Sequence, residues 1–372
     1  MSEDAGRDSG QDTGQKTGEE HAEQNFWGWM TGHADWPAFD RLLFLVYGPK
    51  IMGILRALAE LGVADLIAEE PRGVEELAEA AQVKEQPLLR VLRAAAALGI
   101  VHQEPDGRFA LTPEGEPLRT GLPNSLRDLV IFSGDALLTA PYAEITHSVR
   151  TGRPAFEKIH GSPFYEHAET HPQDAALFDK TMVQRSWLTA VTLLRQVDLT
   201  GRTRLADIGG GRGHFLSEAL RHHPGLEGLL FEREAVLEHA RPLLEEGGVA
   251  GRVTLEAGDF FEKVPPGYEM YTLNAVLNGF DDADALRVLE RVREAMGEDR
   301  EARLYIFEKV MTASANAWDY SKLIDMDMLV LFGGRERTLE DWHRLTDAAG
   351  FALLTEPRPG GSPWTALECR IK

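Results

Sequence analysis

Two parts of the C-terminal half contain residues that together could bind a nucleotide-like ligand. Residues 207–213, DIGGGRG, separate a short apolar run from an amphipathic helical pattern. Glycines in such a turn let the backbone approach a ligand closely, and the N-terminus of the next helix offers unpaired N–H donors. Glu232 ends the following apolar run, where a carboxylate can accept hydrogen bonds from both hydroxyls of a ribose. We therefore predict a cofactor site at Asp207, Gly209, Gly211 and Glu232.

These residues by themselves leave two cofactors open. The glycine spacing also resembles the dinucleotide fingerprint, so NAD is one candidate. A third apolar run is followed by Asp259, Phe260 and Phe261. A polar side chain beside aromatic rings suits an adenine that is wedged edge-on, which favours S-adenosylmethionine (SAM).

The elements that must position these residues alternate between strand-like and helical patterns from Arg204 onward. Such alternation predicts an α/β domain over residues 196–372, with a mainly parallel, doubly wound, Rossmann-like sheet that binds its ligand at the carboxyl edge. The expected strands are LADIG, GLLFE, VTLEAGD, MYTLNAV, RLYIFEKV, FALLTE and TALECRIK, and the expected helices are HFLSEALRHH, AVLEHARPLLEE, ADALRVLERVREAM and TLEDWHRLTDAAG.

The N-terminal part predicts a tail followed by a small helical domain. Residues 1–24 are polar and Gly-rich without bulky apolar side chains, which predicts disorder. Residues 25–119 contain a strongly apolar helical pattern over 39–61, two short helices over 74–81 and 87–98, and a strand pair joined by EPDG. This is a winged-helix outline. Because the first helix has too much apolar surface for a monomer's exterior, we expect it to form a homodimer.

A third segment, residues 120–195, is expected to be a helical cap that contributes to an aromatic substrate pocket. It is rich in aromatic residues, and prolines divide it. Apolar and aromatic side chains are typical of small-molecule pockets. The candidate substrate-binding residues, in the cap and in one later segment, are Phe132, Phe164, Tyr165, Met182, Trp187, Met326 and Phe332.

Composition limits the classes of function. The chain has 372 residues, 43% of them apolar, and no apolar run reaches the roughly 18 to 20 residues of a membrane span. A net charge of −21 opposes binding to nucleic acid phosphates. One cysteine, Cys369, suits a reducing cytoplasm, and no Cys/His/carboxylate cluster has the spacing of metal ligands. We expect a cytoplasmic protein that acts on small molecules without nucleic acid, membrane or metal.

Several ordered segments resemble the SAM-dependent O-methyltransferases of secondary metabolism. They are LADIGGGRGHFL, FEREAVLEHA, RVTLEAGDFF, VLNGFDDADALRVL and GGRERT, and the resemblance covers roughly residues 26–372. It implies that Gly209, Gly211, Glu232, Asp259 and Phe260 bind SAM, and that the chain is an intertwined homodimer.

The chain departs from that family at its catalytic positions. Relatives carry a histidine-aspartate-tryptophan triplet where this chain has Asn278, Gly279 and Phe280, and many carry a lysine where it has Asn274. In the family, that histidine removes the proton of the attacking hydroxyl, and two glutamates orient it. The residues that match those glutamates are Glu308 and Glu336. An amide is not basic, so Asn278 can only orient a group by hydrogen bonding.

We consider three hypotheses for the function of the chain. A subgroup of anthracycline-tailoring enzymes is similar in having glutamate at the ribose position and asparagine at the histidine position, and it contains both O-methyltransferases and a hydroxylase. The first hypothesis is methyl transfer to a hydroxyl or other nucleophile of an aromatic intermediate, with Glu308 or Glu336 as proton acceptor. The second is a non-methylating tailoring step such as hydroxylation, cyclisation or coupling. The third, a DNA-binding regulator that senses a metabolite, is disfavoured by the negative charge.

Overall fold

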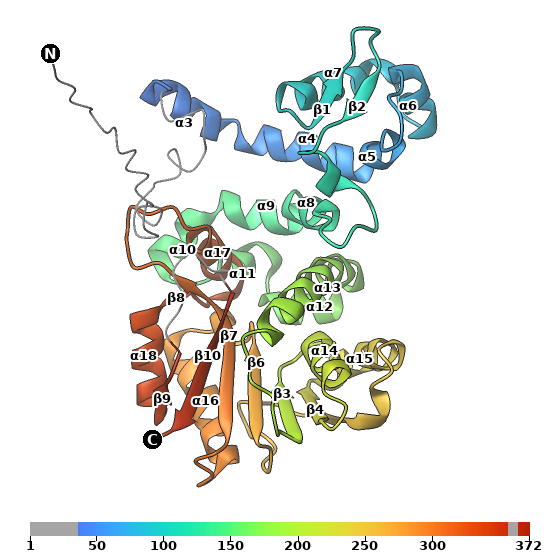
Figure 1. The fold of residues 1–372 in the computed structure, drawn as a ribbon. Helices are drawn as coiled ribbons and strands as arrows, with labels where there is room; N and C mark the ends of the chain where they lie inside the picture. The colour runs from blue at the N-terminus through green and yellow to red at the C-terminus, as the bar shows by residue number, and fades with distance from the viewer. Residues whose placement is uncertain (1–35, 356–363) are drawn as a thin grey trace, which may run out of the picture.

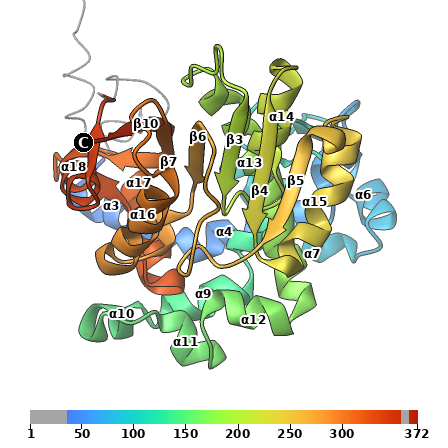
Figure 2. The ribbon, with the colours of Figure 1, turned by 90° about the horizontal axis from the view of Figure 1, so that it is seen from below.

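A twisted β-sheet forms the centre of the C-terminal domain, in the order β5-β4-β3-β6-β7-β10-β9, and β8 pairs with β7. Strands β5, β4, β3, β6 and β7 are parallel, whereas β10 lies antiparallel between β7 and β9. Figure 2 shows the strands side by side from β10 to β5. Their bounds are β3 Arg204–Ile208, β4 Glu227–Glu232, β5 Val253–Ala257, β6 Met270–Asn274, β7 Arg303–Met311, β8 Arg337–Thr338, β9 Phe351–Leu353 and β10 Trp364–Ile371.

The computed structural model describes residues 36–355 and 364–372, without the side chains of Asp179 and residues 183–189. The predicted tail over residues 1–24 and the side chain of Trp187, a predicted pocket residue, lie outside the described part.

Two hydrophobic layers cover the sheet, because its buried strands present apolar side chains on both faces. On one face, Ile208 and Leu229 pack with α16 (Asp282–Met296) and α18 (Leu339–Ala348). On the other face, Leu205 and Leu230 pack with α13 (Pro172–Leu194), α14 (His214–His222) and α15 (Glu234–Glu246). The predicted doubly wound α/β domain is confirmed.

The N-terminal domain has the predicted short helices and strand pair around a core of its own. Leu77, Leu92 and Phe109 are fully buried at its centre. Strands β1 and β2 are antiparallel, with His102 opposite Ala110. The elements are α4 Gly48–Glu60, α5 Val63–Leu66, α6 Val74–Ala80, α7 Glu85–Ala97, β1 Val101–Gln103, β2 Phe109–Leu111 and η1 Glu116–Leu118.

The strongly apolar segment over residues 39–61 is not the single helix that its spacing predicts. It forms α3 (Ala38–Val46) and α4, which meet at 46°. Pro49 lies two residues after the break at Tyr47, and it has no backbone N–H to donate to the carbonyl of Leu45, so the helical hydrogen bonds are interrupted there. Among the described helices, none is long and apolar enough to cross a membrane alone, although this bent pair passes by length and composition together.

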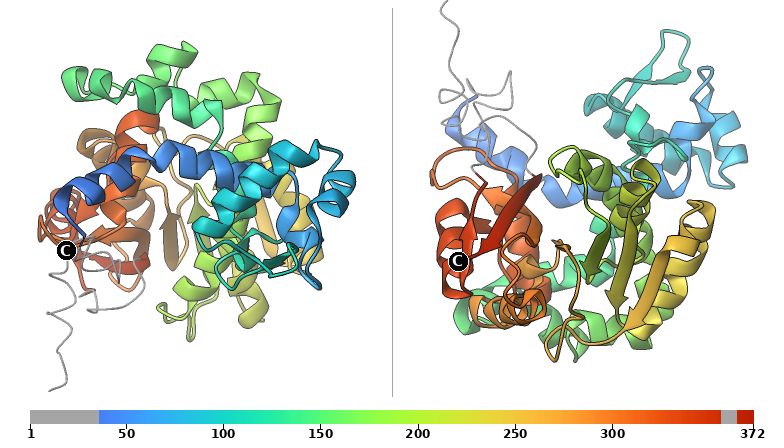
Figure 3. Two further views of the ribbon diagram at one scale, coloured as in Figure 1. Left: turned by 90° about the horizontal axis from the view of Figure 1, so that it is seen from above. Right: turned by 60° about the horizontal axis from the view of Figure 1, so that its bottom comes forward.

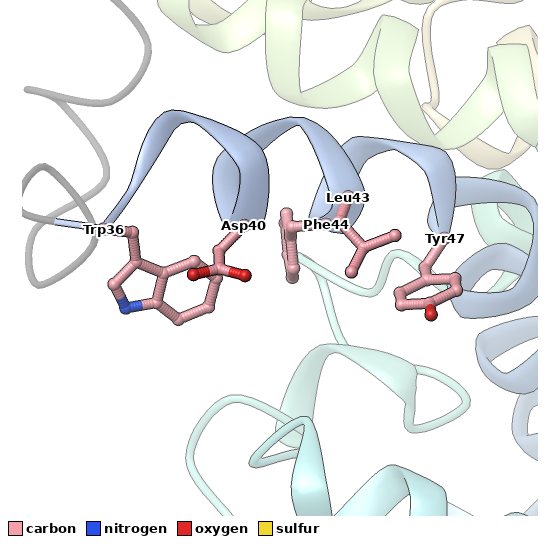
Figure 4. Close-up of a pocket in the computed structure, with 5 residues that line it drawn as sticks. All are labelled: Trp36, Asp40, Leu43, Phe44 and Tyr47. Atoms are coloured by element: carbon pink, nitrogen blue, oxygen red, sulfur yellow. The ribbon is translucent and has the colours of Figure 1, made fainter.

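Helix α3 leaves an apolar surface exposed. Phe39 is 75% exposed, Leu42 65% and Val46 62%. Beside it, Trp36, Asp40, Leu43, Phe44 and Tyr47 line a shallow groove (Figure 4). Seen from above, α3 and α4 run across the top of the molecule as an arm (Figure 3, left). A contiguous apolar surface of this kind is typical of a protein–protein interface.

The cap helices lie between the N-terminal domain and the sheet (green in Figure 1). They pack around Phe156, Phe164 and Phe132, together with the π-helix η4 (Met328–Phe332) that follows α17 (Ser321–Asp327). The cap helices before α13 are α8 Arg127–Ser133, α9 Ala136–Ala143, α10 Ile145–Thr151, α11 Ala155–His160 and α12 Phe164–Thr170, and two short 3-10 turns, η2 Ala250–Arg252 and η3 Leu277–Gly279, lie within the sheet domain.

Candidate functional site

Glycines shape the turn between β3 and α14. Gly209, Gly211 and Gly213 have φ angles of +65°, +59° and +80°, a conformation that other residues rarely adopt. At Gly210, an added Cβ would lie 2.2 Å from the Asp207 carboxylate. The turn thus exposes backbone beside the first N–H groups of α14, as predicted for residues that approach a ligand.

Asp207 lies fully buried under this turn. Its Oδ1 accepts a hydrogen bond of 2.7 Å from the Thr272 hydroxyl on β6, while its Oδ2 is buried without a partner. Burial is the main cause that raises the pKa of Asp207 to about 7; the Thr272 hydrogen bond opposes this shift, and the charge of Glu232 adds to it. A buried oxygen of this kind is available to a hydrogen-bond donor on a ligand.

Glu232 reaches back to the glycine turn from the end of β4. Its Oε2 accepts a hydrogen bond of 3.2 Å from the Gly211 N–H, and its Oε1 accepts one of 2.8 Å from the Arg233 N–H. The Arg233 side chain points toward the cap. Its Nη1 donates a hydrogen bond of 2.7 Å to the Glu169 carboxylate, and its guanidinium carbon lies 5.6 Å from the centre of the Tyr165 ring. The cap helix α12 is therefore tied to the carboxyl edge of the sheet beside Glu232.

An aromatic group borders the turn on its other side. Phe260, Phe261 and Phe280 lie with ring centres 5.1 to 6.0 Å apart, and a Cβ on Gly209 would lie 3.3 Å from the Phe260 ring. The Asp259 carboxylate is exposed and accepts a hydrogen bond from the Phe261 N–H. The structure thus brings Asp259 and Phe260 to the predicted cofactor turn, and it places Asn274, half-buried, at the end of neighbouring β6.

Asn278 lies in η3, shortly after β6, and its backbone N–H and its side-chain nitrogen both donate hydrogen bonds to buried glutamates. Its backbone N–H donates to Glu308 Oε1 at 3.1 Å, and its Nδ2 donates to Glu336 Oε1 at 3.1 Å. Its carbonyl oxygen accepts a hydrogen bond from the Arg335 N–H at 2.9 Å. The three predicted catalytic residues therefore form one buried cluster, although they come from three separate segments.

A lysine completes this cluster, and sequence reasoning did not identify it. Lys309 is 2% exposed, and its Nζ lies 3.3 Å from Glu336 Oε1 and 4.2 Å from the centre of the Trp364 ring. Side chains alternate between the two faces of a strand, so the pattern of β7 predicts that Lys309 points away from Glu308. The sequence therefore did not indicate the ion pair between Lys309 and Glu336.

Arg337 holds the Asn278 loop in place and was also missed. This fully buried guanidinium donates to the carbonyl oxygens of Leu277 at 2.8 Å and Phe280 at 3.0 Å, and to Asp282 Oδ1 at 2.9 Å. A planar guanidinium can bridge several acceptors at once. An arginine in a conspicuously polar GGRERT segment was the available signal.

Burial and the neighbouring Glu336 charge raise the pKa of Glu308 to about 8, compared with 4.5 for an ordinary glutamate. Between these pH values the folded protein retains a proton that the unfolded chain has released. The contribution of Glu308 to the free energy of unfolding therefore falls as pH rises from about 4.5 to about 8, by about 1.4 kcal/mol per pH unit.

We expect Glu308→Gln, which cannot titrate, to become more stable relative to the wild type by that slope between about pH 5.5 and pH 7.5. Urea unfolding at a series of pH values measures this difference. Glu340→Gln, at an exposed position, is the matched control and should show little change. A Glu308→Gln difference that is independent of pH would contradict the assignment.

The predicted pocket residues divide between the core of the cap and its surface. Phe132 and Phe164 are buried in the cap core, and Phe332 packs on Phe164 at 4.8 Å between ring centres. Tyr165 is exposed, with its ring 5.8 Å from that of Phe332. Met182 on α13 and Met326 on α17 are half-buried. Their role in binding a substrate stays a prediction.

Two family models match the chain. Residues 142–352 match the family described as O-methyltransferase domain, and residues 45–119 match the O-methyltransferase dimerisation domain. Among curated proteins, the 8-amino-8-demethylriboflavin N,N-dimethyltransferase of Streptomyces davaonensis is 37% identical to this chain, over 91% of this chain and 97% of that protein.

Solved structures agree with these matches. The structure of mitomycin 7-O-methyltransferase superposes with a TM-score of 0.83 at 31% identity, over 90% of this chain and 98% of that one. An O-methyltransferase from neocarzinostatin biosynthesis, solved with S-adenosylmethionine and 2-hydroxy-5-methyl naphthoic acid, superposes with a TM-score of 0.74 at 30% identity, over 87% and 96% of the two chains.

Proposed function

Because the chain belongs to the family of SAM-dependent O-methyltransferases, we propose that it transfers the methyl group of SAM to a hydroxyl or other nucleophile on an aromatic natural-product intermediate. The predicted family, fold class and cofactor are confirmed by the comparisons. The proposal depends on one observation about the site. The glycine turn and the Glu232 carboxylate lie next to the buried cluster of Asn278, Glu308 and Glu336, and the aromatic cap covers them.

The residues at the turn fit SAM. The buried, unpartnered Asp207 Oδ2 can accept a hydrogen bond, and Glu232 holds a carboxylate that is 12% exposed at the edge of the turn. We infer that Asp207, Gly209, Gly211 and Glu232 bind the cofactor, with further contacts from Asp259, Phe260 and Asn274. Bound there, SAM supplies a sulfonium methyl group that is electrophilic without further activation. The protein's own tasks are then to align the acceptor and to exclude water.

Glu232→Gln should weaken binding of S-adenosylhomocysteine by about 10- to 100-fold. Hydrogen bonds to a charged group contribute about 1.5 to 3 kcal/mol each, and every 1.4 kcal/mol is about tenfold in affinity. Isothermal titration calorimetry measures this change. Glu169→Gln, which removes only an exposed partner of Arg233, is the control and should change affinity by less than about fivefold, since exposed ion pairs contribute about 0 to 1 kcal/mol. Equal losses in both variants would contradict the role of Glu232.

The choice of an aromatic acceptor rests on the cap and on relatives. Tyr165 of the cap helix α12 and Phe332 at the end of η4 lie with their ring centres 5.8 Å apart, and flat aromatic side chains favour offset-stacked or edge-on contacts with flat ligands. The similar neocarzinostatin enzyme was solved with a naphthoic acid, and the similar S. davaonensis enzyme is named for methylation of an amino-riboflavin at nitrogen. Both an oxygen and a nitrogen acceptor are therefore consistent with the relatives.

Incubation with methyl-labelled SAM and a panel of aromatic hydroxyl and amino acceptors tests the proposal. We expect label to be transferred to at least one aromatic acceptor. Tight SAM binding without label transfer to any member would count against methyl transfer.

A second candidate function is a non-methylating tailoring step on such a scaffold, with SAM bound but not consumed. Asn278 and Asn274, which stand where the family carries a histidine and often a lysine, favour it. A product that forms without release of S-adenosylhomocysteine would support this candidate over methyl transfer.

We infer that the chain acts as a homodimer through α3 and its groove. The support is the dimerisation-domain match over residues 45–119 and the apolar surface of α3 (Figure 4). Sedimentation equilibrium should give twice the mass of one chain, and a monomer at micromolar concentration would refute the inference.

A further inference from the structure

We propose that Asn278 selects an acceptor atom that carries a hydrogen, because Glu336 and Lys309 fix its amide with the oxygen toward the acceptor. The site then takes an aromatic amine with at least one N–H, or a neutral hydroxyl, and it disfavours acceptor atoms that offer only a lone pair. Asn278 is the specificity-determining residue, and Glu336 is a positioning residue that acts through it. This inference rests on the proposed methyl transfer to an aromatic acceptor and narrows its substrate class.

The loop of Asn278 lies beside the cofactor turn. A Cβ added at Gly209 would lie 3.0 Å from the side chain of Val276, two residues before Asn278. Asn278 is 8% exposed, whereas Glu308 is fully buried and Glu336 is 1% exposed. Asn278 is therefore the member of the buried cluster that a ligand at the carboxyl edge of the sheet can contact.

One glutamate oxygen decides which end of the Asn278 amide is free. Glu336 Oε1 lies 3.3 Å from Lys309 Nζ and 3.1 Å from Asn278 Nδ2. An ammonium has only donors, so this oxygen acts as an acceptor, and the end of the amide that faces it must be the N–H donor. The reverse orientation would set two acceptor oxygens against each other. Asn278 Oδ1, which has no hydrogen-bond partner among the described residues, is therefore the free end.

The backbone around this amide is held as firmly as its side chain. The Asn278 N–H donates to Glu308 Oε1 at 3.1 Å. Gly334 packs so closely on the other side that an added Cβ would lie 2.0 Å from the Asn278 carbonyl oxygen. Glu336 is fixed in turn, since its backbone N–H donates to Asp325 Oδ1 at 2.7 Å. Because both the loop and the carboxylate are held by several contacts, we expect the amide to keep one orientation.

A carbonyl oxygen at this place favours a hydrogen-bond donor on the acceptor atom. An amide oxygen can accept a hydrogen bond but cannot donate one. An N–H or O–H of the acceptor can therefore pair with Asn278 Oδ1, while a lone pair of the same acceptor atom stays free to point at the methyl carbon. A ring nitrogen without hydrogen would instead face Oδ1 with its lone pair, and both atoms would stay unpaired. The hydrogen bond sets this orientation whichever group later receives the proton.

Binding of three aromatic probes to the full-length enzyme, saturated with S-adenosylhomocysteine in mildly alkaline buffer, tests this inference. 2-Aminonaphthalene carries an N–H donor, 2-fluoronaphthalene has a similar shape without a donor, and isoquinoline offers only the lone pair of its ring nitrogen. We expect calorimetry to show that 2-aminonaphthalene binds about 10-fold or more tightly than either of the others. Equal affinities for 2-aminonaphthalene and isoquinoline would overturn the inference and leave methyl transfer intact. Binding of none of the probes would overturn both the inference and the proposed aromatic acceptor.

Two variants separate the roles of Asn278 and its partners. In Lys309→Met/Glu336→Gln, the new amide can pair with Asn278 in either orientation. Isoquinoline should then gain about fivefold or more in affinity, whereas 2-aminonaphthalene should lose only about twofold, because about half of the molecules still present the oxygen. Asn278→Leu, which removes both ends of the amide, should bind 2-aminonaphthalene and 2-fluoronaphthalene about equally. Glu340→Gln, at an exposed position, is the control and should keep the wild-type ratios. A double variant that also keeps them would show that Glu336 does not position the amide.

Discussion

Replacing Asn278 by histidine is expected to raise the rate of methyl transfer to weakly acidic phenols by about 10²- to 10⁴-fold, the usual contribution of a positioned general base. The position is prepared for such a base. Asn278 Nδ2 already donates to Glu336 Oε1 at 3.1 Å, so an imidazole there could donate one ring N–H to the same carboxylate and present its other nitrogen to the acceptor. Initial rates with labelled SAM measure the gain.

The control for this variant is Asn278→Gln, which retains an amide and should bring no gain. The pH profile of Asn278→His should level off near the pKa of its imidazole instead of following the acceptor, since the enzyme then supplies the base. If Asn278→His binds SAM as tightly as the wild type and still methylates no phenol, the second candidate function, a non-methylating step, becomes the better account of the site.

Lys309→Met should lower the free energy of unfolding by about 3 to 5 kcal/mol, the usual cost of removing one partner of a buried ion pair. Lys309 and Glu336 are almost completely buried, and the nitrogen lies 3.3 Å from the carboxylate. Methionine fills a similar volume but leaves the Glu336 charge without its cation. Urea denaturation at pH 7 measures the loss.

The double variant Lys309→Met/Glu336→Gln is the decisive comparison for this pair. It removes both charges, so we expect most of the lost stability to return, because the net contribution of a buried ion pair is small once neither charge is stranded. Arg344→Met, which removes surface ion pairs with Glu340 and Asp341, should cost less than about 1 kcal/mol. A double variant as unstable as the single one would mean that Lys309 acts through packing rather than through charge.

Local patterns predicted the sheet domain and the cofactor turn well. Apolar runs alternate with helical patterns from Arg204 onward, and each predicted strand appears in the structure. Gly209, Gly211 and Glu232 meet because the carboxyl ends of adjacent parallel strands lie at one edge, and β3 and β4 are adjacent, with Ile208 opposite Phe231. The excess of apolar residues on α3 was visible as well, although the bend at Tyr47 was not expected.

Resemblance to a family located Asn278, Glu308 and Glu336, but neither it nor the sequence pattern described their environment. Strand alternation does not foresee that Lys309 reaches Glu336 or that Arg337 spans the Leu277 and Phe280 carbonyls. The raised pKa of Glu308 also depends on complete burial and on a glutamate 28 positions away in the chain.

The sequence by itself thus determined which segments become strands and helices, where the cofactor turn lies, and that an amide stands at position 278. These features depend on neighbours along the chain and on the fixed geometry of parallel strands. Only the tertiary structure decided which charges are buried together, which carboxyl retains a proton and which cap residues are core. The reason is that desolvation and ion pairing depend on distances between segments far apart in sequence, which no local pattern encodes.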